Sequence, residues 1–132
     1  MIVVDTSVLI PFLKGSRLGP AQRLREIEHD GLPVAIPAVC GQEVLQGAKD
    51  EREWGMLLDA LSTQKILLPA DPRQTHIEAA RIFFDCRRKG ITIRSTLDCL
   101  IAQLVLENDG ILLHDDEDFD RIKKVRPLRT LR

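Results

Sequence analysis

The chain has 132 residues, of which 44% are apolar and 30% are charged, and its formal net charge is −1. This length suits one compact domain, so we expect residues 1–132 to form a single domain, and the composition excludes a disordered or fibrous protein. A net charge near zero argues against attraction of the whole surface to nucleic acid, so any contact with a polynucleotide has to use local basic patches.

Short apolar runs alternate with helical patterns along the chain. In the first half we predict a strand over residues 1–4 and then a helix that follows the Asp5-Thr6-Ser7 turn and runs to residue 14. A polar periodic segment over 19–30 comes next, followed by a strand over 33–37 and by helices over 38–49 and 51–62. In the second half we predict a strand over 66–68, a long amphipathic helix over 75–88, a helix over 92–108 and a strand over 111–113. Fully apolar strands joined by helices are typical of a parallel sheet covered on both faces. We therefore predict an α/β fold with three layers, α/β/α, around a short and mainly parallel central sheet.

The sequence has neither a membrane span nor a disulfide pattern. No apolar run approaches the roughly 18 to 20 residues that a span needs, and the N-terminus lacks the features of a signal peptide. We therefore expect no membrane association and a cytoplasmic location. The three cysteines, Cys40, Cys86 and Cys99, are odd in number and have no C-x-x-C spacing, which predicts small buried thiols and no zinc site.

Four acidic residues fall near the carboxyl ends of the predicted strands. Asp5 ends the first strand and Asp116 follows the last one, while Glu43 lies in the helix after the second strand and Asp98 lies near the start of its helix. Ligands of open α/β sheets bind in the crevice at this edge, so we expect the four side chains to meet there. Carboxylates at such close range repel one another unless divalent cations neutralise them.

Oxygen ligands without histidine or cysteine favour Mg²⁺ or Mn²⁺ over Zn²⁺. Sites of this kind act on phosphates, because the ions can activate water and stabilise the charge that develops at phosphorus. The pattern therefore predicts a metal-dependent nuclease. In this hypothesis Asp5, Glu43 and Asp98 hold the first metal, and Asp116 binds a second metal or positions the water.

Each acid also has a purely structural explanation. Asp5 could be only the N-cap of the helix that follows, and Ser95-Thr96-Leu97-Asp98 resembles a capping box. The run of Asp115, Asp116 and Asp118 is typical of a solvated turn, and its pattern does not say which acid faces inward. Glu43 lies at the edge of the apolar arc of its helix, a placement that favours a functional role.

Two segments could supply basic patches. The first is Arg87-Arg88-Lys89 together with Arg94, and the second is residues 121–132, which hold six basic residues and no acidic one. Solvated surface explains both segments equally well.

At these residues the sequence resembles the PIN-domain ribonucleases, and specifically the VapC toxins of bacterial and archaeal toxin–antitoxin modules. The resemblance spans nearly the whole chain and lies in four ordered motifs, which are the opening residues 2–10, Glu43 after the second strand, residues 98–102 and residues 112–119. It implies a PIN-like fold and a metal-dependent endoribonuclease. It also implies a metal site of Asp5, Glu43, Asp98 and Asp116, with Asp118 as an additional acid and Ser7 as a hydroxyl beside the site.

The resemblance further implies an RNA substrate, a homodimer and a cognate VapB-type antitoxin whose C-terminal segment covers the acidic groove. In this family an antitoxin arginine often lies among the carboxylates, which suits the bidentate geometry of guanidinium and carboxylate. The family usually has Thr or Ser where this chain has His114. We therefore expect His114 to be a structural residue at a strand end and assign it no catalytic role.

Two rival functions fit parts of the pattern. A Mg²⁺-dependent phosphatase with a strand-end Asp nucleophile would carry a second Asp two residues after Asp5, where this chain has Ser7. A non-catalytic RNA- or protein-binding module of the same fold would have no electrostatic reason to keep a repulsive cluster of acids. The residues define neither the RNA target nor the choice between one metal and two.

Overall fold

The computed structural model describes residues 1–132 and contains one five-stranded sheet in which neighbouring strands are all parallel. The strands are β1 (Ile2–Val4), β2 (Val34–Pro37), β3 (Lys65–Leu67), β4 (Ile111–Leu113) and β5 (Thr130–Leu131), in the order β3-β2-β1-β4-β5. The central strand β1 therefore lies between β2, which follows it in the chain, and β4, which comes from the far half of the sequence.

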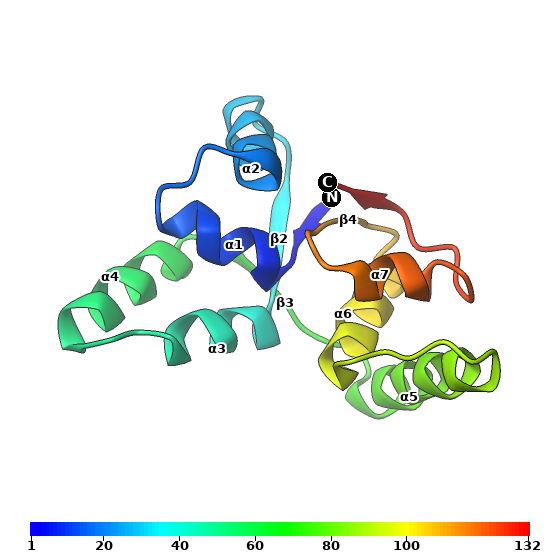
Figure 1. The fold of residues 1–132 in the computed structure, drawn as a ribbon. Helices are drawn as coiled ribbons and strands as arrows, with labels where there is room; N and C mark the ends of the chain where they lie inside the picture. The colour runs from blue at the N-terminus through cyan, green and yellow to red at the C-terminus, as the bar shows by residue number, and fades with distance from the viewer.

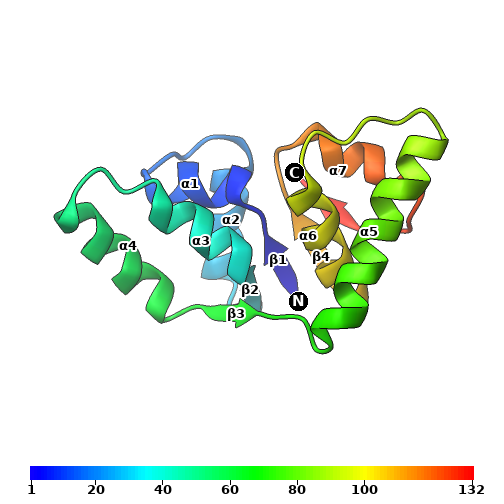
Figure 2. The ribbon, with the colours of Figure 1, turned by 90° about the horizontal axis from the view of Figure 1, so that it is seen from below.

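Seven helices connect the strands and form a layer on each face of the sheet. They are α1 (Thr6–Leu13), α2 (Gly19–His29), α3 (Ala38–Gln46), α4 (Glu51–Ser62), α5 (Pro72–Arg88), α6 (Thr96–Glu107) and α7 (Glu117–Ile122). Helices α1 to α4 pack together on one side of the sheet, and α5 to α7 pack together on the other (Figures 1 and 2). This arrangement confirms the predicted α/β/α fold.

The central strands are apolar along their whole length because helices cover both of their faces. Val3 and Val4 of β1 and Leu112 and Leu113 of β4 are fully buried. All three cysteines are buried and free, as predicted. No helix of the structure combines the length and the apolar character that crossing a membrane requires.

Two helices begin at other residues than the periodicity predicted, and in one of them the cap is Ser95, which the capping-box pattern had indicated. The helix predicted from residue 75 begins at Pro72, because the Asp71 carboxylate accepts a hydrogen bond from the Gln74 N–H and proline suits a first turn. The helix predicted from residue 92 begins at Thr96, because the Ser95 hydroxyl accepts from Leu97 N–H.

The other differences concern element ends and two short elements. The helix predicted to run to residue 49 ends at Gln46, and the strand predicted over 66–68 covers Lys65–Leu67. Helix α7 and strand β5 were not predicted, because six and two residues are too few to establish a period. Helix α7 matters most, since it carries the acidic segment that follows β4.

Phe119 anchors α7 to the core. Its ring is fully buried and lies edge-on to the His114 ring, with the centroids 5.1 Å apart. We expect Phe119→Ala to lower the free energy of unfolding by about 3–5 kcal/mol, measured by urea denaturation, because it removes a large side chain from a packed site. Phe84→Ala on α5 is the control, since that ring is 38% exposed and should cost about 1 kcal/mol or less. Equal losses in the two variants would contradict this account of α7.

Candidate metal centre

The site forms where the carboxyl ends of β1 and β4 lie side by side. Val4 pairs with Leu113, and the N–H of Asp5 donates to the Leu113 carbonyl at 3.0 Å. The connections from β1 and to β4 run over opposite faces of the sheet, which creates a crevice at this edge in open α/β folds. Asp5 and the segment after β4 both emerge at this crevice.

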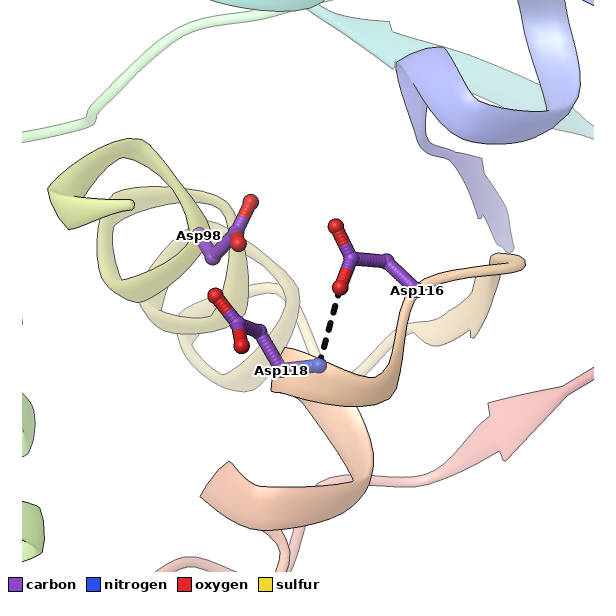
Figure 3. Close-up of side chains that lie close together, drawn as sticks. All are labelled: Asp98, Asp116 and Asp118. Carbon is purple, nitrogen blue, oxygen red and sulfur yellow. Dashed lines mark hydrogen bonds between the residues drawn. The ribbon is translucent and has the colours of Figure 1, made fainter. Parts of the chain in front are cut away.

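Three carboxylates converge beside the crevice. Asp98, Asp116 and Asp118 each offer an oxygen within 4.8 Å of the others. Asp98 lies in the first turn of α6, Asp116 is the N-cap of α7, and Asp118 lies in the first turn of α7. In Figure 3 the three side chains point into one space between these helix starts, and Asp116 accepts a hydrogen bond from the Asp118 N–H at 2.9 Å.

Asp5 caps α1 and, although it is not one of the three acids that meet within 4.8 Å, it lies close enough for its charge to interact with Asp116 and Asp98. It is only 4% exposed, and its carboxylate accepts hydrogen bonds from the N–H and the hydroxyl of Ser7. The Ser7 oxygen in turn accepts from the Asp115 N–H at 2.9 Å, so Ser7 ties the start of α1 to the loop after β4. Burial raises the pKa of Asp5, and the charge of Asp116 adds to this effect. The Asp5 carboxylate therefore both caps α1 and lies near the acidic cluster.

Glu43 contacts the start of α1 and is not part of the tightest cluster of acids. It is half-buried on α3, and its carboxylate accepts a hydrogen bond from the Thr6 hydroxyl at 3.0 Å. It therefore sits beside the start of α1, but it is not among the three carboxylates that meet within 4.8 Å. Asp118, which the sequence suggested only as an addition, is one of those three.

A neutral thiol lies next to Asp5. The Cys40 Sγ is 4.0 Å from Asp5 Oδ1 and fully buried. Burial raises the pKa of this thiol to about 12, with a further contribution from the negative charge of Asp5. Because metals bind the thiolate, the neutral Cys40 leaves the donor set at this edge purely oxygen.

Asp98 and Asp118 share a proton across the cluster. Burial raises the pKa of Asp98 to about 8, helped by its hydrogen bond with Asp118 and by repulsion from Asp116 and Asp5. Burial also disfavours the charge on Asp118, but hydrogen bonds from Asp98, Arg94 and Arg121 hold its pKa below the usual range. Without metal, the proton therefore rests on Asp98 and Asp118 carries the charge.

Arg94 contacts two acids of the cluster, which its place in a predicted basic patch did not indicate. Its guanidinium donates to Asp116 at 3.1 Å and to Asp118 at 3.3 Å, and its N–H donates to Asp118 at 2.9 Å. In the sequence, Arg94 precedes the helix that carries Asp98, but the acids that it contacts lie more than twenty residues later. Local patterns therefore could not predict these contacts.

His114 holds the backbone of Asp116. It is 1% exposed, and its Nδ1 accepts a hydrogen bond from the Asp116 N–H at 3.1 Å. Burial lowers the pKa of His114, so the ring is neutral and keeps this lone pair available. The neighbouring Asp115 is exposed and lies 3.6 Å from Arg132, which leaves Asp116 as the inward acid of the pair.

The donor set fits a hard divalent cation. Its members offer only carboxylate oxygens, which Mg²⁺ and Mn²⁺ prefer. Two features reveal a local excess of negative charge, namely the proton retained by Asp98 and the guanidinium of Arg94 on Asp116 and Asp118. A divalent ion would supply the missing positive charge and displace the proton.

Comparisons with known proteins agree on one family. The family model for the PIN domain matches residues 2–125. The VapC ribonuclease Mb1587 of Mycobacterium bovis and the ribonuclease VapC11 of Mycobacterium tuberculosis are each 30% identical over 131 residues, which cover 98% of this chain and 97% of theirs.

Solved structures share the fold at lower identity. A VapBC2 complex from Rickettsia felis bound to a promoter DNA fragment superposes with a TM-score of 0.76 at 18% identity, covering 99% of this chain and 98% of the matched one. A DNA-bound VapBC from Salmonella typhimurium has the same TM-score at 21% identity, covering 98% and 96%.

We expect the metal-free protein to lose stability as the pH rises from about 4 towards about 8, between the unfolded and the folded pKa of Asp98. Folded Asp98 keeps a proton that the unfolded chain releases near the ordinary aspartate pKa of 3.8, so rising pH favours unfolding. Asp98→Asn is neutral throughout. It should flatten this decline and raise the free energy of unfolding at pH 8 by at least about 1.4 kcal/mol, the equivalent of one pKa unit.

Urea denaturation in EDTA at several pH values measures this effect. Asp59→Asn, on the exposed surface of α4, is the control and should follow the wild type. Parallel curves for wild type and Asp98→Asn would show that the Asp98 carboxyl is not the titrating group.

Proposed function

The chain belongs to the PIN-domain family and, within it, to the VapC ribonucleases, and from this membership we propose that its acidic crevice is the active site of a metal-dependent endoribonuclease toxin. The observation that carries the proposal is the convergence of Asp98 and Asp116 beside the carboxyl edge of the sheet, with Asp5 near enough for its charge to act on both. A phosphodiester approaching this edge meets carboxylates that need a cation, which is the arrangement that phosphoryl-transfer chemistry uses.

We assign the metal to Asp5, Asp98 and Asp116, with Glu43 completing the set from the α3 side. When bound, Mg²⁺ or Mn²⁺ would lower the pKa of the attacking water and neutralise charge on the phosphate. Asp116 is held for this task by its own N-cap geometry and by the hydrogen bond from its N–H to His114.

Asp118 is better described as a positioning residue. Its carboxylate is 1% exposed, and Arg94, Arg121 and Asp98 already hydrogen-bond to it. These contacts leave little room for an ion on Asp118. Instead, Asp118 holds the two arginines and directs the Asp98 carboxyl towards Asp116.

The partners follow from the same family. We propose an RNA substrate and a VapB-type antitoxin, since the structural neighbours are named as VapBC complexes. We also propose that residues 1–132 act as one nuclease unit, that the protein forms a homodimer, and that it works in the cytoplasm, where its RNA substrate is found.

The two rival functions are less well supported. A phosphatase needs an Asp with an oxygen free to attack phosphorus, whereas one Asp5 oxygen accepts two hydrogen bonds from Ser7 and the other lies 4.0 Å from the Cys40 thiol. A binding module without turnover does not account for an Asp98 carboxyl kept at a raised pKa.

We expect the purified protein to cleave RNA in the presence of Mg²⁺ or Mn²⁺, and we expect EDTA to stop the cleavage. Asp5→Asn, Asp98→Asn and Asp116→Asn should each slow cleavage by about 100-fold or more, because each removes a carboxylate from the proposed metal site. Asp115→Asn is the matched control for Asp116, since it changes the adjacent exposed acid, and it should stay within about threefold of wild type. Cleavage by folded Asp98→Asn at the wild-type rate would refute the proposal.

Glu43 is tested separately, because it lies outside the tightest cluster. We expect Glu43→Gln to weaken Mn²⁺ binding by about 10-fold in calorimetry, and Thr6→Val to weaken it less, since it removes only the hydrogen bond that orients Glu43. Glu51→Gln, on the exposed first turn of α4, serves as the control. An unchanged Mn²⁺ affinity in Glu43→Gln would remove Glu43 from the metal set.

A further inference from the structure

A polar groove adjoins the acidic crevice on the far side of Arg94. It has a volume of about 360 Å³ and is lined by residues 90–92 of the loop after α5, by Arg94, by Arg121 of α7 and by Lys124 in the turn that follows α7. Only one of its six lining residues is hydrophobic. The lining therefore suits a charged ligand and not an apolar one.

The groove gathers three basic side chains, one of which has no acidic partner. Arg94 pairs with Asp116 and Asp118, and Arg121 also pairs with Asp118. The second partner of Arg121 is Glu117, whose side chain is 71% exposed, so solvent weakens that pair. Lys124 has no acidic partner within 4.0 Å.

Three other cations of the C-terminal segment pair with acids outside the groove. Arg126 pairs with Asp85, Arg129 with Asp109, and Arg132 with Asp120. In the other basic segment, Arg87 and Arg88 keep their charge but lie over the rings of Phe83 and Phe84. The groove is therefore distinguished by its position, because three basic side chains line it directly beside the acids.

Arg94 separates the groove from the acids and contacts both. Its guanidinium contacts Asp116 and Asp118, and the same side chain lines the groove while remaining 65% exposed. Asp118, buried beneath it, holds both guanidiniums in place before any ligand arrives. A ligand that spans Arg94 would meet the proposed metal site on one side and the basic side chains of the groove on the other.

We propose that this groove binds a backbone phosphate of the RNA that neighbours the phosphate being cleaved. The inference deepens the proposed function and rests on it for the identity of the ligand. A polynucleotide repeats its negative charge at every nucleotide, so one phosphate can lie at the acids with their metal while the next one lies among Arg94, Arg121 and Lys124. Contacts of this kind fix the register of the strand without reading its sequence.

Lys124 is the residue to change, because it lines the groove but contacts none of the acids. Lys123 is its matched control, since it is adjacent, equally charged and exposed, but its Nζ lies 3.2 Å from the Thr130 hydroxyl and it does not line the groove. Binding of single-stranded RNA is measured in EDTA at increasing salt, so that no cleavage occurs and the acids affect every variant alike.

We expect Lys124→Gln to weaken binding and to reduce the slope of log K against log salt by about 0.7, the value for one phosphate contact on a single strand. Lys123→Gln should keep the wild-type slope. Equal slopes in wild type and Lys124→Gln, or equal changes in both lysine variants, would overturn the proposal. A loss of antitoxin binding in Lys124→Gln with no change towards RNA would do the same, because the groove would then be a protein contact.

A second measurement locates the phosphate. Single phosphates of an RNA substrate are replaced in turn by neutral methylphosphonates, and cleavage is followed with Mg²⁺. In the wild type, one replacement beside the cleaved bond should lower kcat/KM by about 10-fold, and Lys124→Gln should abolish that sensitivity while Lys123→Gln retains it. Retained sensitivity in Lys124→Gln would contradict the groove assignment. If the wild type cuts no RNA at all, the proposed function fails, and the salt slopes still decide whether the groove binds phosphate.

Discussion

Repulsion among carboxylates gathered in one partly buried crevice governs this structure. Asp5, Asp98, Asp116 and Asp118 come from three separate parts of the chain, and each lies close enough to affect the charge of another. In the absence of metal the fold relieves the repulsion with a proton on Asp98 and with the guanidiniums of Arg94 and Arg121 on Asp118. The proton and the two guanidiniums supply positive charge at the place where a bound metal ion would supply it.

The buried acids lower the stability of the folded protein. A carboxyl whose pKa is raised to about 8 disfavours the folded state at neutral pH, and functional sites commonly retain such unfavourable groups. The neighbouring contacts limit the cost. Ser7 bonds the start of α1 to the loop after β4, and His114 holds the N–H of Asp116, so the acids are fixed before an ion binds.

The sequence predicted what local patterns determine. Apolar runs predicted the central strands, and the acids that follow them pointed to Asp5 and Asp116, because strand ends in a parallel sheet share one edge. Asp98 was placed at the same edge from its position near the start of a predicted helix. The contacts of Arg94 could not be predicted, since they join a loop to residues more than twenty positions later. The buried, arginine-bound state of Asp118 depends on α7, which is too short to have a periodic signal. The place of Glu43 outside the tightest cluster depends on how α3 packs beside α1, which no local pattern reports.

The chain order of the site has a consequence for biosynthesis. The first acid of the site, Asp5, directly follows the first strand, and the acids at the start of α7 are synthesised more than a hundred residues later. A ribosome therefore makes almost all of this domain before the crevice can close around a cation. While its own message is being translated, the nascent chain holds Asp98 without Asp116 and Asp118, so the acidic cluster is complete only when the last part of the domain has been made.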